Sequence, residues 1–321
     1  MSYVLTMQAD IGKYTFRSLS EVRISRSRSE LAATASITLP SEYDSQYLCN
    51  VIKGGDRVSI RLGYEGHGIR EEFTGYVVDV SQRRPVVIEC EDEMYQLKRQ
   101  HPKAKSWKTV KLVEVIRYLV PGAQLDEVPD VTLSPFSIKG GGSTFDAIDE
   151  LCDKYGLQAF YQGGQFHVMV PYTDMKSGTA RYDLEQNVIR PDLTYRREGD
   201  VRIKINAVSI LPSNKKLRID VGDSDAASVT TLHFYNVTTE AELRRLAQDK
   251  LKTMKYDGFS GSITTFGIPY AEPGMTAEIR DRRFSGNRYG RYMIDAVTTT
   301  AGRGGFRREV KIGRALSNEQ K

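Results

Sequence analysis

Cysteines and long apolar runs are scarce in this sequence of 321 residues. Cys49, Cys90 and Cys152 are odd in number and widely spaced, so we expect no disulfide framework and a reducing compartment during folding. No apolar run approaches the ~20 residues that a membrane-spanning helix needs. The first residues, Met-Ser-Tyr-Val-Leu-Thr-Met-Gln, also lack the basic and apolar regions of a secretory signal. We therefore expect no membrane partner.

The patterns that mark a metal, cofactor or catalytic site are also missing. The four histidines lie far apart, and none has a cysteine, histidine or carboxylate at metal-ligand spacing: His67, His101, His167 and His233. The run Gly-Gly-Gly-Ser at 140–143 is not followed by the lysine and the serine or threonine of a phosphate-binding loop. No serine lies in a Gly-x-Ser-x-Gly motif. We expect no catalytic residue, no metal and no cofactor, and we expect that the protein is not an enzyme.

Composition places the chain among ordinary globular proteins, with 27% charged and 40% hydrophobic residues. Its length suggests two or three domains, each able to bury a core of its own. The formal net charge of +5 is mild, and the basic residues are scattered along the chain. A nucleic-acid-binding protein usually concentrates its positive charge on one element, so we expect no specific nucleic-acid partner.

The chain repeats a piece of itself. Residues 54–80 and 273–297 both begin with a glycine turn and continue as an alternating strand that ends near Arg61 or Arg280. A charged, glycine-bearing hairpin tip follows in each. Each return strand then carries Tyr-x-apolar-Asp, at Tyr76 to Asp79 and at Tyr292 to Asp295. The repeat predicts two copies of one β-domain, and the alternative is a chance match between two β-hairpins. A trimer of such chains would present six similar domains in a ring.

Hydrophobic periodicity predicts β-structure at both ends of the chain and an α/β module between them. Residues 1–95 contain short runs with period two, such as 22–25 and 35–39, which is typical of half-buried strands. Residues 186–321 return to this pattern, interrupted by one helix at about 239–254. A capping box of Thr239 and Glu242 marks the start of that helix. We predict an α+β, β-rich fold with two small tube-like β-barrel domains at 1–95 and 186–321 and a small α/β module at 96–185.

Two helices and a hairpin are expected in the module. Thr109 is the candidate cap of a helix that stops at Pro121-Gly122, and its apolar face is Leu112, Val115, Ile116 and Leu119. The second helix runs from an N-cap at Ser143, paired with Asp146, to a left-handed stop at Gly156. A glycine turn at 163–164 then joins two strands.

The two hairpin tips are the candidate functional surfaces. Residues 64–70 and 282–289 occupy matching places in the repeat and are polar, charged and glycine-bearing. They are either solvated loops or long hairpins, 62–73 and 281–291, that reach toward a neighbouring ring. On the second interpretation the subunit or tube contacts are Tyr64, His67, Arg70, Arg282, Arg283, Arg288 and Tyr289.

Several segments, in this order, resemble one known family. They are the turn and strands at 53–58 and 73–80, the capped helix and following strand at 143–161, and the segments 273–275, 292–297 and 304–306. The chain resembles the baseplate or tail-tip hub proteins of tailed phages and related contractile injection systems. This family includes the T4 baseplate hub, the Mu-type 43 kDa tail protein, the late control protein D family and the N-terminal part of the type VI secretion spike.

The resemblance implies a structural hub rather than an enzyme. Members of such a family would form a homotrimeric, pseudo-sixfold ring that joins a hexameric tail tube to a trimeric spike. The implied partners are the tail tube protein, a separate spike protein and other baseplate proteins. The implied location is the virion tail or baseplate, assembled in the cytoplasm of a bacterial host.

Two interpretations from other classes stay open. One is a tail-associated enzyme that acts on glycans or peptidoglycan, with Glu89 or Glu91 of the acidic run 89–93 as its acid. The alternative for that run is a salt-bridge network at a surface or subunit contact. The other class is a nucleic-acid-binding β-protein, with the candidate contacts Arg280, Arg282, Arg283, Arg288, Tyr289 and Tyr292.

Overall fold

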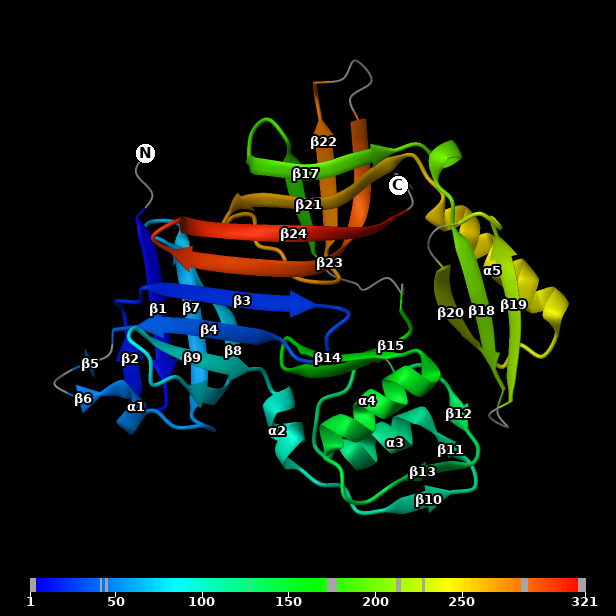
Figure 1. Cartoon of the computed structure of the whole chain (residues 1–321), viewed down its shortest axis with the longest axis horizontal. Coiled ribbons are helices and arrows are strands. Elements are labelled where there is room, and N and C mark those ends of the chain that lie inside the picture. The colour runs from blue at the N-terminus through cyan, green and yellow to red at the C-terminus, as the bar shows by residue number, and fades with distance from the viewer. Residues whose placement is uncertain are drawn as a thin grey trace. The chain divides into compact units, whose positions relative to one another are not determined.

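The computed structural model describes residues 4–40, 42–43, 46–126, 128–171, 178–211, 215–226, 229–283 and 288–316. The chain divides into two compact units (Figure 1). Unit 1 comprises residues 1–96, 175–193 and 261–313, and unit 2 comprises residues 97–174, 194–260 and 314–321. Each unit is therefore built from segments that are far apart in the sequence.

The strands of unit 1 come from both ends of the chain. Its N-terminal elements are β1 (Leu5–Ile11), β2 (Tyr14–Phe16), β3 (Glu21–Ser27), β4 (Thr34–Leu39), β5 (Glu42–Tyr43), β6 (Gln46–Tyr47), α1 (Leu48–Val51), β7 (Arg57–Tyr64), β8 (Gly68–Val80), β9 (Val86–Glu91) and the start of α2 (Met94–Arg99). Its later elements are β16 (Thr179–Asp183), β17 (Val188–Arg196), β21 (Gly258–Phe266), β22 (Thr276–Asp281), β23 (Arg288–Gly302) and β24 (Gly305–Ala315). The last residues of β17 and the first of β21 lie in unit 2.

Unit 2 contains the helices of the predicted module and a further sheet. The first set is β10 (Lys105–Trp107), β11 (Val110–Lys111), α3 (Leu112–Leu119), β12 (Thr132–Leu133), β13 (Phe136–Ile138), α4 (Thr144–Tyr155), β14 (Gln158–Gln162) and β15 (Gln165–Met169). The second set is a 3₁₀ turn at Glu198–Asp200, β18 (Lys204–Ile210), β19 (Lys216–Gly222), β20 (Val229–Tyr235) and α5 (Glu240–Met254). Strands β19, β18 and β20 form one sheet in that order.

One extended sheet organises unit 1. In the described residues its strand order is β17-β21-β24-β23-β3-β4-β9-β8-β7-β1-β2, with β22 beside β23 and β16 beside β22. Side chains alternate along its strands as the sequence predicts, so Val22 and Ile24 of β3 and Ile37 of β4 are buried. Their core cluster also includes Ala301 and Phe306 from the other end of the chain. The two ends are therefore joined by both pairing and packing.

The helices of unit 2 follow the local signals in the sequence. Ser143 accepts a bond from the Asp146 amide, the Asp146 carboxylate accepts one from the Ser143 amide, and Gly156 ends α4 in the left-handed conformation. Helix α3 buries the four predicted apolar residues, but it begins after Lys111 without a side-chain cap. Thr109 is therefore not its cap and instead contacts the Ser134 hydroxyl, 3.1 Å away. No described helix is long and apolar enough to cross a membrane.

The α+β, β-rich fold class is confirmed, whereas the chain does not divide along the three expected ranges. The expected domain 186–321 is split, because residues 194–260 cluster with unit 2 and residues 261–313 with unit 1. Hydrogen bonding explains the split. Strand β23 pairs with β3, so the C-terminal strands join the N-terminal ones in a single sheet.

Candidate functional site

The internal repeat is present in the backbone pairing of unit 1. In the first half of the chain, the Gly55 amide donates to the Val77 carbonyl at 2.8 Å, and the Val77 amide donates to the Asp56 carbonyl at 2.9 Å. In the second half, the Gly274 amide donates to the Ile294 carbonyl and the Ile294 amide to the Met275 carbonyl, both at 2.8 Å. The same glycine turn is thus tied to the same point of a long return strand in both halves.

These bonds correct one part of the predicted repeat. They align Val77 with Ile294, so Tyr76 aligns with Met293 and the match between Tyr76 and Tyr292 is wrong by one residue. The cause is a bulge in β8, whose register against β9 shifts between Val77 and Asp79. Val78 is the extra residue, and it brings Asp79 level again with Asp295.

Strand order shows how far the two copies correspond. We call β3, β4, β7, β8 and β9 the N-terminal copy, and β17, β21, β22, β23 and β24 the C-terminal copy. In both, the third and fourth strands form a hairpin, and the fourth, fifth, second and first lie side by side in that order. The likeness ends outside these strands, because β1 runs antiparallel to β7 whereas β16 runs parallel to β22.

The two copies meet at one strand junction. Strand β23 pairs with β22 along its first part, from Arg288 to Met293. From Ala296 to Gly302 it pairs antiparallel with β3, between Ser27 and Glu21. The Arg28 amide starts this second pairing by donating to the Asp295 carbonyl at 2.9 Å. The fourth strand of one copy is thereby joined to the first strand of the other.

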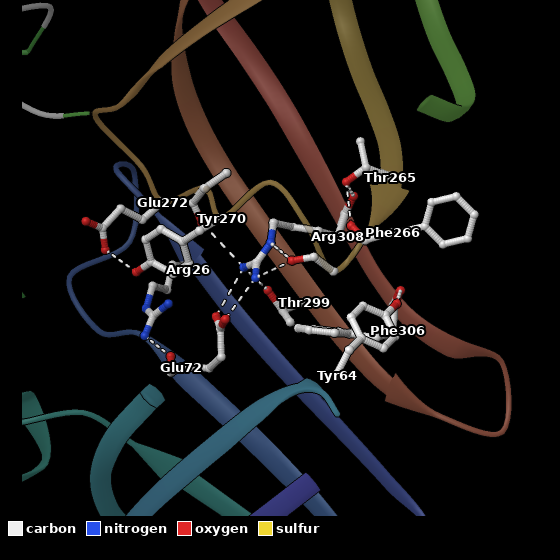
Figure 2. A network of polar contacts seen from close by, with 12 residues as sticks. Arg26, Tyr64, Glu72, Thr265, Phe266, Tyr270, Glu272, Thr299, Phe306 and Arg308 are labelled. Carbon is white, nitrogen blue, oxygen red and sulfur yellow. Dashed lines mark hydrogen bonds and ion pairs between the residues drawn. The ribbon is translucent and has the colours of Figure 1, made fainter. Parts of the chain in front are cut away.

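A buried ion pair also joins the copies (Figure 2). Arg308 of β24 and Glu72 of β8 have side chains that are 1% and 2% exposed. The guanidinium donates to both carboxylate oxygens, at 2.9 and 3.2 Å. It also donates to the Thr299 hydroxyl at 2.9 Å and to the Gly267 carbonyl at 3.0 Å. A bidentate pair with this many further bonds fixes the position of both strands.

Tyr270 extends this network toward the first hairpin. The Arg70 guanidinium lies 3.6 Å from the centre of the Tyr270 ring, and the Arg308 guanidinium lies 5.1 Å from it. The Tyr270 hydroxyl donates to Glu272 at 2.7 Å. Burial, with the nearby Glu272 charge, raises the pKa of Tyr270 to about 12. Arg26 donates to the Glu72 carbonyl and connects β3 to the same group (Figure 2).

The first tip differs from the prediction at its tyrosine. Tyr64 is only 7% exposed and packs against Phe306, with ring centres 5.6 Å apart. Tyr64 is therefore a core residue of unit 1 and not a surface residue of the tip. His67 is exposed at the turn, and its amide donates to the Tyr64 carbonyl. Arg70 is exposed, and its guanidinium stacks on the Tyr270 ring in a cation–π contact within unit 1.

The arginines of the second tip are paired with carboxylates of the same unit. Arg282 contacts Asp183 at 2.8 Å, and Arg283 contacts Asp281 at 2.9 Å and Glu185 at 3.2 Å. The hydrogen bond from Arg283 lowers the pKa of Asp281. These contacts position the base of the tip.

Residues 284–287, the centre of the predicted tip, lie outside the described residues. Arg288 follows them and pairs with Asp281 in the ladder. Tyr289 is 41% exposed on β23. The structure thus places the predicted contacts of each tip in one hairpin, while their role in subunit or tube contact stays a prediction.

The acidic run contains one carboxylate pair and one buried carboxyl. Glu89 lies directly opposite Asp79 in the β8–β9 ladder. Burial, with the Asp79 charge, raises the pKa of Glu89. Asp92 accepts from the amides of Ala33 and Met94, and burial raises its pKa to about 7. No group of three or more His, Cys, Asp or Glu side chains in the described ranges is placed to hold a metal.

Comparison with known proteins gives matches by structure and none by sequence. No family model and no curated protein matches the chain. A tail protein from Neisseria meningitidis MC58 matches with a TM-score of 0.65 at 13% identity, over 98% of this chain and 97% of that one. The 43 kDa tail protein of prophage MuSo2 from Shewanella oneidensis matches at 0.61 and 15% identity, over 98% of both chains.

A type VI secretion component gives a similar result. The E. coli c3393 protein, which has structural similarity to the T4 bacteriophage tail proteins gp27 and gp5, matches with a TM-score of 0.57 at 9% identity. The match covers 97% of this chain and 77% of that one. The resemblance expected from the sequence is thus confirmed at the level of fold. This chain has the fold of phage tail proteins and of the type VI secretion components related to them.

Proposed function

We propose that this protein is a structural hub of a phage tail or related injection system, in which three chains form a ring that joins a hexameric tube to a trimeric spike. The observation that carries the proposal is the junction between β23 and β3, where one chain joins two copies of the same β-domain edge to edge. The shared fold with tail proteins supports the same conclusion.

The repeat explains how such a ring would match two symmetries. Two copies per chain and three chains give six similar domains around one axis. A closed ring of this kind uses heterologous contacts, in which each domain meets the next through two different surfaces. One face of the ring would then offer six near-equivalent positions to a tube, and the other would offer three to a spike. Permanent interfaces of this class commonly bury ~2,000 Å² or more.

The hairpin tips are the proposed contacts with the neighbouring ring. The surfaces are the exposed side chains of His67 and Arg70 on the first tip and of Tyr289 on the second. The ion pairs of Arg282 and Arg283 would support the second tip from behind. We propose no catalytic role and no cofactor for the chain. Its partners would be the tube protein, a separate spike and other baseplate proteins, in a virion tail assembled in the host cytoplasm.

The mass of the purified protein in solution tests the proposal. Light scattering across a range of concentrations should give a particle near three times the 36.2 kDa of one chain. Addition of purified tube protein should then yield a complex of higher mass, and deletion of residues 65–68 should weaken that complex without changing the trimer. A strict monomer at every concentration, alone and with tube protein, would contradict the ring.

A further inference from the structure

Among the strand edges of unit 1 that carry no neighbour in the described residues, two lie at corresponding places in the two copies. Strand β17 pairs with β21 on one side only and is one end of the sheet. Strand β8 is paired with the turn at Gly55 and Asp56 up to Val77. Beyond Val77, the same edge of β8 has no partner strand in the described residues, whereas β9 covers the opposite edge.

The junction inside the chain uses the equivalents of these two edges. In the C-terminal copy, the Met275 carbonyl bonds to β23 at Ile294, and β23 pairs with β3 directly after that residue. Strand β23 corresponds to β8, and β3 corresponds to β17. One chain therefore makes this junction once, from the C-terminal copy to the N-terminal copy. The reverse junction, from β8 to a β17, is left unmade.

Burial supports this interpretation of β17. Strand β3 has a neighbour on each side, and Val22 and Ile24 are 0% and 1% exposed. Strand β17 occupies the same place in its own copy, but none of its nine residues is buried. Ile189 is 43% exposed there, and Val78 at the bulge of β8 is 40% exposed. An apolar side chain thus lies exposed on each of the two free edges.

Charge is also complementary between the two edges. Asp79 and Glu89 face each other across β8 and β9, and no ion pair joins either one to a cation in the part of the chain that is described. Like charges placed directly opposite each other in a ladder are unfavourable. Strand β17 carries Arg190, whose side chain is 68% exposed and contacts only the neighbouring Asp192 among the described ion pairs. A strand with an exposed arginine suits this acidic edge.

We propose that residues 78–80 of β8 pair antiparallel with β17 of a second copy of this chain. This pairing rests on the ring proposed above. Repeating the junction three times would close the ring and leave neither of these two edges free, as closure does for the edges of a β-barrel. The free stretch of β8 is shorter than the 296–302 segment of β23, and Pro191 removes one amide donor from β17. The contact is therefore a short ladder, with Val78 and Ile189 adding apolar burial.

Disulfide trapping tests this pairing. In a Cys49→Ser background, which removes the exposed native thiol, Val78→Cys or Val80→Cys would each be combined with Ile189→Cys or Asp192→Cys. The four double variants sample neighbouring registers, and the single variants are baselines. The matched control is Val78→Cys with Val229→Cys, because Val229 is a 59% exposed valine on the edge strand β20 of unit 2. Far-UV circular dichroism would confirm that each variant is folded.

The expected result is a covalent dimer and trimer in at least one double variant, at a yield about tenfold or more above the single variants and the control. Two thiols held in one assembly react at a much higher effective concentration than two free ones. A trimer by light scattering with no cross-link in any of the four variants would overturn the pairing and leave the hub proposal standing. A monomer with no cross-link would overturn both.

Discussion

Replacement of Arg308 by methionine should destabilise unit 1 severely. The change removes the guanidinium but leaves the Glu72 carboxylate in a site where it is 2% exposed. Breaking a buried ion pair in this way costs about 3–5 kcal/mol, because one charge remains without its partner. The Thr299 hydroxyl and the Gly267 carbonyl also lose a donor. We expect a loss in the free energy of unfolding at the upper end of that range.

Urea unfolding would measure the loss with two probes. Far-UV circular dichroism follows the strands, most of which lie in unit 1, whereas Trp107 is the single tryptophan and lies in unit 2. A shift that is larger in dichroism than in tryptophan fluorescence places the damage in unit 1. The control is Arg307→Met at the preceding residue. The Arg307 guanidinium donates to the Phe306 carbonyl and is not part of the buried pair. It should cost about 1 kcal/mol or less.

A double variant decides whether the charge or the packing is responsible. Arg308→Met together with Glu72→Met leaves no charge in the site and retains apolar volume on both strands. Replacing a whole buried pair by apolar residues is often neutral or stabilising, so the double variant should recover most of the loss. A loss of less than about 1 kcal/mol for Arg308→Met alone, or a double variant no more stable than the single one, would refute the unpaired buried charge as the cause.

Three further predictions concern single sites. Burial raises the pKa of Asp92 to about 7. The stability that the protonated Asp92 carboxyl contributes is therefore complete below pH ~4 and is lost as the pH rises through 7. Asp92→Asn should flatten the fall in melting temperature over that range, and an unchanged slope would contradict this. Gly156→Ala should cost about 1–3 kcal/mol more than Gly122→Ala, because both residues have positive φ but only the Cβ at 156 would lie 1.9 Å from the His233 ring; equal losses by tryptophan fluorescence would contradict the clash. Ser143→Ala should cost about 1 kcal/mol by removing the cap of α4, and urea midpoints measured by the same fluorescence would test it.

Local signals in the sequence were sufficient to predict an element whose structure depends only on its own residues. Helix α4 shows this, because its cap at Ser143, its apolar stripe and its stop at Gly156 all depend on residues within a few positions of one another. The repeat was also visible, since a glycine turn and an alternating strand keep their pattern in both copies. Both kinds of signal depend on residue types and spacings that can be read directly from the sequence.

Long-range pairing explains what the sequence did not show. Arg308 and Glu72 are 236 positions apart, and neither lies in a motif that marks it as buried. Residues 186–321 were expected to form one domain, but β23 pairs with β3, and no pattern within a strand specifies its neighbour. The one-residue error at Tyr292 has a local cause, because the extra residue at Val78 cannot be told from an ordinary strand residue. The buried position of Tyr64 depends on Phe306, from the other copy.

The two junctions of the proposed ring face different demands, and their chemistry differs accordingly. The junction between β23 and β3 forms as the chain folds, so it can pair over a long stretch, and the buried pair of Arg308 and Glu72 joins the same two copies. A strand edge that pairs only with a second chain stays exposed before assembly, so it must not promote aggregation of the single chain. A proline, a bulge and exposed charges all limit unwanted pairing along a free edge, and β17 and the end of β8 have all three between them. Such an edge disfavours pairing with strands of unrelated proteins but can still pair with one strand of matching shape and charge. An assembly of fixed size requires this specificity.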